Sequence, residues 1–136
     1  MNDHLQTNQQ VGVWIDHTEA FVVFNHKPAK EGEVIVSNIE KHVRYSGHAM
    51  AGSGDGEDTR ERHFEKMLNN YYDEVITHLN NAASIFIFGP GEAKGEFKKR
   101  LERTGPNIQI VGFEVADKLT DNQIVAKVHS FFARRL

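Results

Sequence analysis

The sequence of 136 residues contains no cysteine and no long apolar run. Without cysteine there can be no disulfide, no zinc–thiolate site and no cysteine nucleophile, and this absence fits a reducing cytoplasm. No apolar stretch approaches the roughly 18 residues that a membrane-spanning helix needs. The start, MNDHLQTNQQ, lacks the apolar core of a secretory signal. We therefore expect a cytoplasmic protein without a membrane span, in which 1–10 is a disordered lead-in.

A strong excess of charge of one sign is also missing. The formal net charge is −3, with eight histidines that would raise it in mild acid. A value this close to zero does not indicate a nucleic-acid-binding protein, because phosphate contacts need a local basic surface. The length and the 39% hydrophobic content predict one domain with a substantial core, over 11–136.

The first third of the chain predicts a three-stranded antiparallel meander. Apolar runs at 11–16, 19–25 and 33–45 are separated by short polar connections. The next segment, 46–58, reads SGHAMAGSGDGED and holds four of the eleven glycines with almost no large apolar residue. Such a segment cannot bury enough surface to offset the entropy lost on ordering, so we expect a mobile loop.

A long helix is predicted after this loop. Asp58 is a candidate N-cap, and Glu61 three residues later would complete a capping box. Apolar residues then follow at helical spacing and indicate a core-facing stripe: Phe64, Met67, Leu68, Tyr71, Tyr72, Val75, Ile76 and Leu79.

The remainder of the chain alternates strands and helices. Strands are expected at 84–88 and 108–115, a helix from Glu92 to Arg103, and a last helix capped by Thr120 and Gln123. The order β-β-β-α-β-α-β-α predicts an α/β domain with a mixed five-stranded sheet and helices on both faces, and the right-handed crossover rule restricts its topology. The ribonuclease-H-like architecture has this order.

The turn Gly89-Pro90-Gly91 between a strand and a helix invites comparison with phosphate-binding loops. It fails the P-loop pattern, because no Lys-Ser or Lys-Thr follows, and it fails G-x-G-x-x-G, because Lys94 occupies the third glycine position. Pro90 also removes a backbone donor. We expect no nucleotide and no cofactor here, but a turn whose glycines permit unusual φ values and which places Lys94 in the first helical turn.

The same segment resembles a known family. The pattern I-x-x-G-P-G-x-x-K-x-x-F is similar to the strand–loop–helix segment in the central domain of archaeal and eukaryotic class I peptide release factors and of Pelota, and small bacterial relatives of that domain are similar in size. The matching positions are Phe86 (where the family often has isoleucine), Gly89, Pro90, Gly91, Lys94 and Phe97. The order of meander, mobile loop and long helix with a basic start also matches. The resemblance implies a ribonuclease-H-like fold, also seen in ribosomal proteins.

The chain departs from the family in the mobile loop. Release factors carry Gly-Gly-Gln there, whereas 46–58 has no glutamine and is acidic at Asp55, Glu57 and Asp58. We therefore expect no peptide release, and a non-catalytic domain. The resemblance still implies a ribosome or structured-RNA partner, and the candidate contacts are Arg44, Arg60, Arg62, His63 and Lys94.

Two other functions stay open from the residues. The first is a Mg²⁺-dependent nuclease. Carboxylates follow or precede the predicted elements much as the Mg²⁺-binding carboxylates of ribonuclease-H-like nucleases do: Asp16, Glu92 and Asp117 (or Asp121). Carboxylates at such positions are also common as turn formers and caps. A protein-interaction module acting as a homodimer is the second possibility. No H-E-x-x-H spacing and no G-x-S-x-G elbow occurs, so metalloprotease and hydrolase sites have no support.

Overall fold

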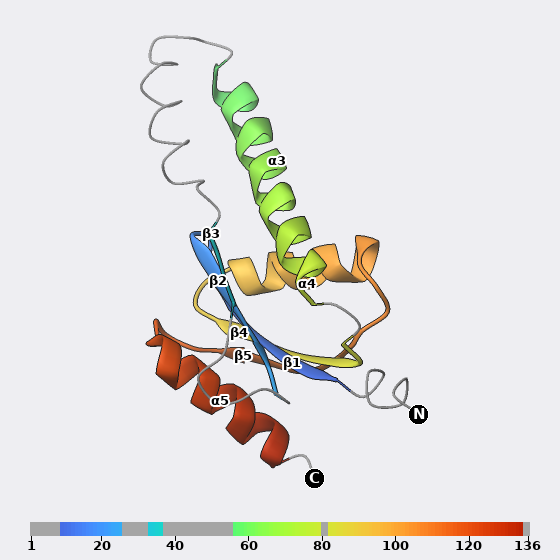
Figure 1. Cartoon of the computed structure of the whole chain (residues 1–136). Coiled ribbons are helices and arrows are strands. Elements are labelled where there is room, and N and C mark those ends of the chain that lie inside the picture. Colours follow the sequence, from blue (N-terminus) through green and yellow to red (C-terminus); the bar gives the residue numbers. More distant parts are fainter. Residues whose placement is uncertain (1–8, 26–32, 37–55, 80–81, 135–136) are drawn as a thin grey trace.

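The computed structural model describes residues 9–25, 33–36, 56–79 and 82–134. Most of the predicted loop, residues 37–45 of the third predicted strand and most of the predicted lead-in lie outside these residues. Five strands and three helices follow in the predicted order (Figure 1). The elements are β1 (Gln10–Ile15), β2 (Glu19–Phe24), β3 (Glu33–Val36), α3 (Gly56–Thr77), β4 (Ser84–Gly89), α4 (Ala93–Thr104), β5 (Gln109–Val115) and α5 (Asp121–Ala133).

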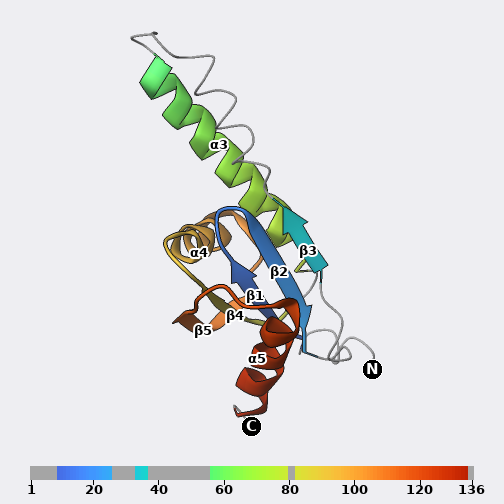
Figure 2. The same cartoon turned by 90° about the vertical axis from the view of Figure 1, so that its left-hand side faces the viewer.

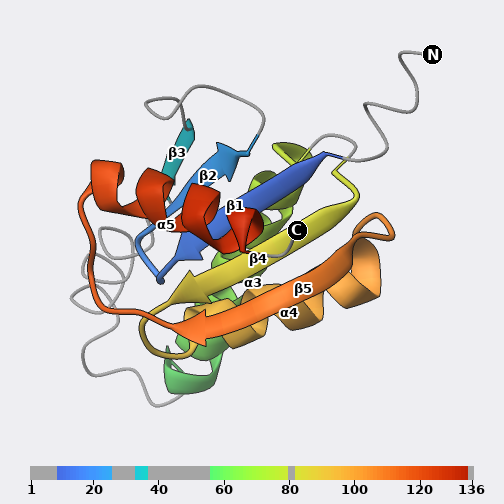
Figure 3. The ribbon, with the colours of Figure 1, turned by 90° about the horizontal axis from the view of Figure 1, so that it is seen from below.

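The five strands form one mixed sheet in the order β3-β2-β1-β4-β5 (Figure 3). The pairs β1–β2 and β2–β3 are antiparallel, and β4 lies parallel to both β1 and β5. This confirms the predicted meander followed by two parallel strands. Among the described residues, β3 and β5 are the edges of the sheet.

Helices cover both faces of the sheet, as predicted. α3 and α4 lie on one face and α5 on the other (Figure 1). The alternation of side chains along β1 therefore serves two cores: Val11, Val13 and Ile15 pack in the cluster with α3 and α4, whereas Trp14 packs in the cluster with α5. No helix among the described residues is long and apolar enough to cross a lipid bilayer.

The apolar stripe of α3 is confirmed. Leu68, Tyr71, Tyr72, Val75 and Leu79 are buried in the core, and Phe64, Met67 and Ile76 are partly buried against it. The predicted start of the helix is wrong, because α3 begins at Gly56. Glycine is tolerated at helix N-termini, so the last three residues of the predicted loop are helical and Asp58 lies inside the helix.

The capping box of α5 is confirmed. Thr120 Oγ1 accepts a hydrogen bond from Gln123 N at 3.2 Å, and Gln123 Oε1 accepts one from Thr120 N at 2.9 Å. Two of the backbone donors that a helix N-terminus leaves unpaired are satisfied in this way.

A bidentate ion pair joins α3 to α4. Arg100 Nε donates to Asp73 Oδ1 and Nη2 donates to Oδ2, both at 2.8 Å. These hydrogen bonds from Arg100 hold the pKa of the Asp73 carboxyl below its ordinary value. The pair fixes the orientation of the lower part of α3 against the body of the domain.

We predict that Asp73→Asn lowers the free energy of unfolding at neutral pH. The stabilisation by a carboxyl with a depressed pKa is present above its unfolded pKa and is lost as pH falls through the folded one. The difference between variant and parent should therefore shrink from about pH 5 to about pH 2. Urea denaturation across this range measures it. Glu102→Gln is the control, since its pair with Lys98 is looser, at 3.8 Å, and exposed. A difference that stays constant in acid would contradict the assignment.

Candidate functional site

The carboxyl ends of β1, β4 and β5 lie along one edge of the sheet, because the three strands are parallel. Ligands of open α/β sheets bind outside this edge. The glycine turn follows β4 here, with Gly89 at φ 152° and Gly91 at φ 62°. A Cβ on Gly89 would overlap the carbonyl oxygen of Ile15 on the neighbouring strand. The prediction that these glycines permit unusual φ values is confirmed.

Lys94 is held inside this turn. It is only 8% exposed, and its Nζ donates a hydrogen bond to the carbonyl oxygen of Gly91 at 2.6 Å. The same Nζ lies 5.8 Å from the centroid of the Phe113 ring. The ammonium therefore satisfies a backbone acceptor and stacks on an aromatic face, which gives Lys94 a structural role in fixing the turn.

A hydrogen-bonded cluster lies beside the turn. Glu96 Oε1 accepts a hydrogen bond from Tyr72 Oη at 2.7 Å and lies 3.1 Å from His17 Nε2. Burial and the hydrogen bond to Glu96 raise the pKa of Tyr72. Next to it, Tyr71 Oη donates to the carbonyl oxygen of Asp16 at 2.9 Å.

This cluster connects three elements that are distant in the sequence. Tyr71 and Tyr72 come from α3, Glu96 from α4, and Asp16 and His17 from the turn between β1 and β2. The Tyr72 hydroxyl is the donor and the Glu96 carboxylate the acceptor, and this hydrogen bond favours the protonated phenol. The sequence analysis missed the cluster, and the adjacent buried tyrosines were the only sign of it.

The Mg²⁺ site considered from the sequence is not formed. Asp16 Oδ1 accepts hydrogen bonds from the backbone of Thr18 and Glu19, both at 2.8 Å, so this carboxylate closes the β1–β2 turn. Glu92 and Asp117 are exposed. Within the part of the chain that the structure describes, no three His, Asp or Glu side chains gather to hold a metal ion. The strand ends do share one edge, but turn formation uses the carboxylate that a metal would need.

The predicted basic residues lie on a projecting part of α3. We call residues 56–67 the arm, and Figure 2 shows it extending away from the sheet. Phe64 and Met67 at its base pack partly against the core. Arg60, Arg62 and His63 are all exposed on it. At 1.5 Å per residue, position 60 lies about 16 Å along the helix axis from the anchored position 71. They are therefore not brought together with Lys94, and Arg44 lies outside the described residues.

One further cation of the arm was missed. Lys66 is exposed and stands four residues after Arg62, so the two share a face of the helix. Glu65 stands three residues after Arg62 and borders the same face, whereas His63 shares the opposite flank of this face with Lys66. The i, i+4 spacing of Arg62 and Lys66 was the available signal.

Known proteins are similar to this chain in fold. No protein-family model and no curated protein sequence matches the chain. Its fold is similar to that of the Pelota protein from Thermoplasma acidophilum, with a TM-score of 0.54 and 18% identity, over 88% of this chain and 31% of that one. The archaeal translation termination factor aRF1 also matches, with a TM-score of 0.38 and 14% identity, over 99% of this chain and 43% of that one. The chain thus spans less than half the length of either protein. At the level of the fold, the match to Pelota confirms the resemblance inferred from the sequence.

We predict that Gly89→Ala lowers the free energy of unfolding by roughly 2–4 kcal/mol, because the new Cβ combines a strained φ with overlap on a rigid backbone atom. Gly95→Ala is the matched control. Gly95 lies in α4 with open space around its Cβ direction, and the change should stabilise by roughly 0.5–1 kcal/mol. Chemical denaturation of both variants tests this. Equal effects at the two sites would show that the close approach to Ile15 does not constrain the turn.

We also predict that Tyr72→Phe costs about 1–2 kcal/mol, because it removes a hydrogen bond to a charged acceptor. Tyr71→Phe removes a bond to a neutral carbonyl and should cost about 1 kcal/mol or less. Thermal and urea unfolding give both values. If Tyr71→Phe proved the more damaging change, the Glu96 contact would not be the stronger of the two.

Proposed function

We propose that the chain is a non-catalytic, cytoplasmic domain that binds the ribosome or structured RNA. The observation that carries the proposal is the group of exposed basic residues on the arm, Arg60, Arg62, His63 and Lys66, in a fold similar to that of Pelota. The resemblance to release-factor central domains supports the same class of partner.

The shape of the arm suits contact with a phosphate backbone. A helix that stands clear of the domain can enter a groove or cleft, and its exposed cations can approach phosphates without the sheet intervening. The formal charge of the whole chain is −3, and residues 56–67 hold four acidic residues beside Arg60, Arg62 and Lys66. The attraction to phosphates would therefore come from these three side chains individually, at short range. In this proposal Lys94 supports the turn, and the arm makes the contacts.

Peptide release is not part of the proposal. The segment SGHAMAGSGDGED at 46–58 contains no Gly-Gly-Gln, and within the described residues the candidate carboxylates form no metal site. We infer that the chain recognises its partner, and that any reaction in the complex is carried out by the partner.

Co-sedimentation with purified ribosomes and with separate subunits, across a salt series, tests the proposal. We expect binding that weakens steeply with salt. Arg62→Ala/Lys66→Ala should weaken it and reduce the salt slope by about 1 for each cation removed.

Lys99→Ala/Arg103→Ala is the matched control, because it removes the same charge from exposed positions of α4. It should leave most of the binding intact. Equal losses in the two variants would point to nonspecific attraction, and no binding at low salt would overturn the proposal.

A further inference from the structure

The outer edge of β5 is unpaired. β5 is seven residues long and pairs with β4 on one side; no described strand lies on the other. Ala116 N donates to Gly89 O, so alternation along the strand turns the N–H groups of Phe113 and Val115 outward. The strand, QIVGFEV, contains neither proline nor lysine, the residues that commonly block edge pairing.

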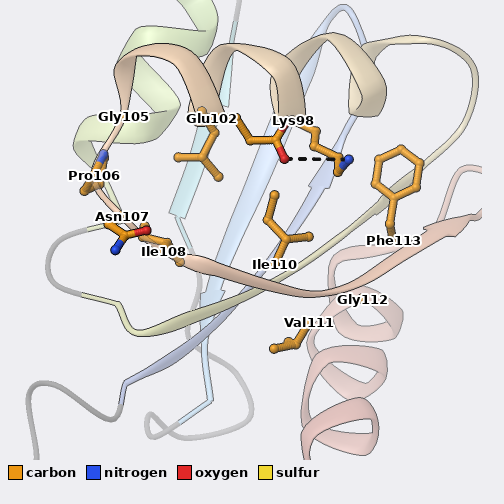
Figure 4. A pocket seen from close by; sticks show the side chains of 11 residues that line it. Lys98, Glu102, Gly105, Pro106, Asn107, Ile108, Ile110, Val111, Gly112 and Phe113 are labelled. Atoms are coloured by element: carbon orange, nitrogen blue, oxygen red, sulfur yellow. Dashed lines mark ion pairs between the residues drawn. The ribbon is translucent and has the colours of Figure 1, made fainter.

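A groove runs along this edge beneath α4 (Figure 4). Its volume is about 760 Å³. Its wall combines polar and apolar groups, and Ile110 and Phe113 point from β5 toward α4. The residues that matter for a ligand are Lys98, Leu101, Glu102, Ile108, Ile110 and Phe113. A bulge at Val111 interrupts the pairing of β5 with β4. A strand added to β5 beyond this bulge would place every second side chain on the groove side.

Phe113 and Val115 remain exposed beside the groove. Phe113 is 44% and Val115 77% exposed, and alternation puts both on the α4 side of the sheet. Two exposed apolar residues at alternate positions of an unpaired edge form a surface that an extended apolar segment would cover.

Lys98 places a positive charge beside the groove, where an acidic side chain of a ligand could pair with it. Lys98 Nζ lies 5.7 Å from the Phe113 centroid, and its ion pair with Glu102 is long, at 3.8 Å, with both side chains exposed. Such a pair contributes little, so Lys98 can exchange Glu102 for a carboxylate held more rigidly on a bound strand.

We propose that β5 accepts an extended peptide segment as a sixth strand, with alternate apolar side chains in the groove and an acidic side chain at Lys98. A second copy of the chain fits less well. Pairing two β5 strands antiparallel about Phe113 would bring the lysines around each ring toward one another. Single-stranded RNA fits less well too, because Glu102 lines the groove beside the Phe113 ring. This proposal is independent of the arm and of the proposed function.

Selection of displayed random decapeptides against the full chain tests the proposal, followed by fluorescence anisotropy with the enriched peptide labelled with fluorescein. We expect alternating apolar residues with one acidic position. Val115→Pro removes an outward N–H donor, a change that edge strands tolerate, and should weaken peptide binding about tenfold or more. Val115→Ala keeps this donor, so its affinity for the peptide should stay within about threefold of the parent's. Lys98→Glu should weaken binding about tenfold and Lys98→Gln less.

The proposal would be overturned if the selection enriched no peptide. It would also be overturned if the enriched peptide bound Val115→Pro and Val115→Ala with the same affinity, or if Lys98→Glu did not change its affinity. A dimer in sedimentation equilibrium that Val115→Pro dissociates would assign the edge to a second copy. Displacement of the peptide by a labelled U12 oligoribonucleotide, with binding of that oligonucleotide lost in Phe113→Ala, would assign it to RNA.

Discussion

Two adjacent buried tyrosines fix the position of α3 at the edge of the sheet. Tyr71 and Tyr72 are almost fully buried, and their hydroxyl groups donate to Asp16 O and Glu96 Oε1. A buried hydroxyl without a partner would cost free energy, so only one position of α3 along its axis satisfies both. That position leaves the exposed residues 59–63 beyond the sheet, and the proposed RNA contacts depend on it.

The glycine turn positions the two elements that it connects, β4 and α4. Gly89 lets β4 end against the backbone of Ile15, and Lys94 then binds the carbonyl of Gly91. This orients the start of α4, which supplies Glu96 to the tyrosine cluster and Lys98 to the groove along β5. The arm and the groove are therefore separate surfaces supported by one packed edge, and each can be altered without changing the other.

Local patterns predicted much of this structure. Helical spacing identified the buried stripe of α3, and the Thr120–Gln123 capping box marked the start of α5. The order of strands and helices along the chain predicted the meander and the two parallel strands. Contacts between distant residues could not be predicted in this way. His17 and Glu96 are 79 residues apart, and only the parallel packing of β1 and β4 brings them together. The carboxylate of Asp16 gave a false metal signal, because turns and metal sites use the same side chains.

In the proposed function the arm, and not α5 on the opposite face of the sheet, faces the ribosome or RNA. Site-specific photocrosslinking tests it most directly, with p-benzoylphenylalanine placed at Glu65 on the arm or at Asn122 on α5, both exposed. We predict that, in the presence of ribosomes, position 65 crosslinks to ribosomal RNA or protein and position 122 does not. Equal crosslinking at both positions, or crosslinking at 122 alone, would contradict the account.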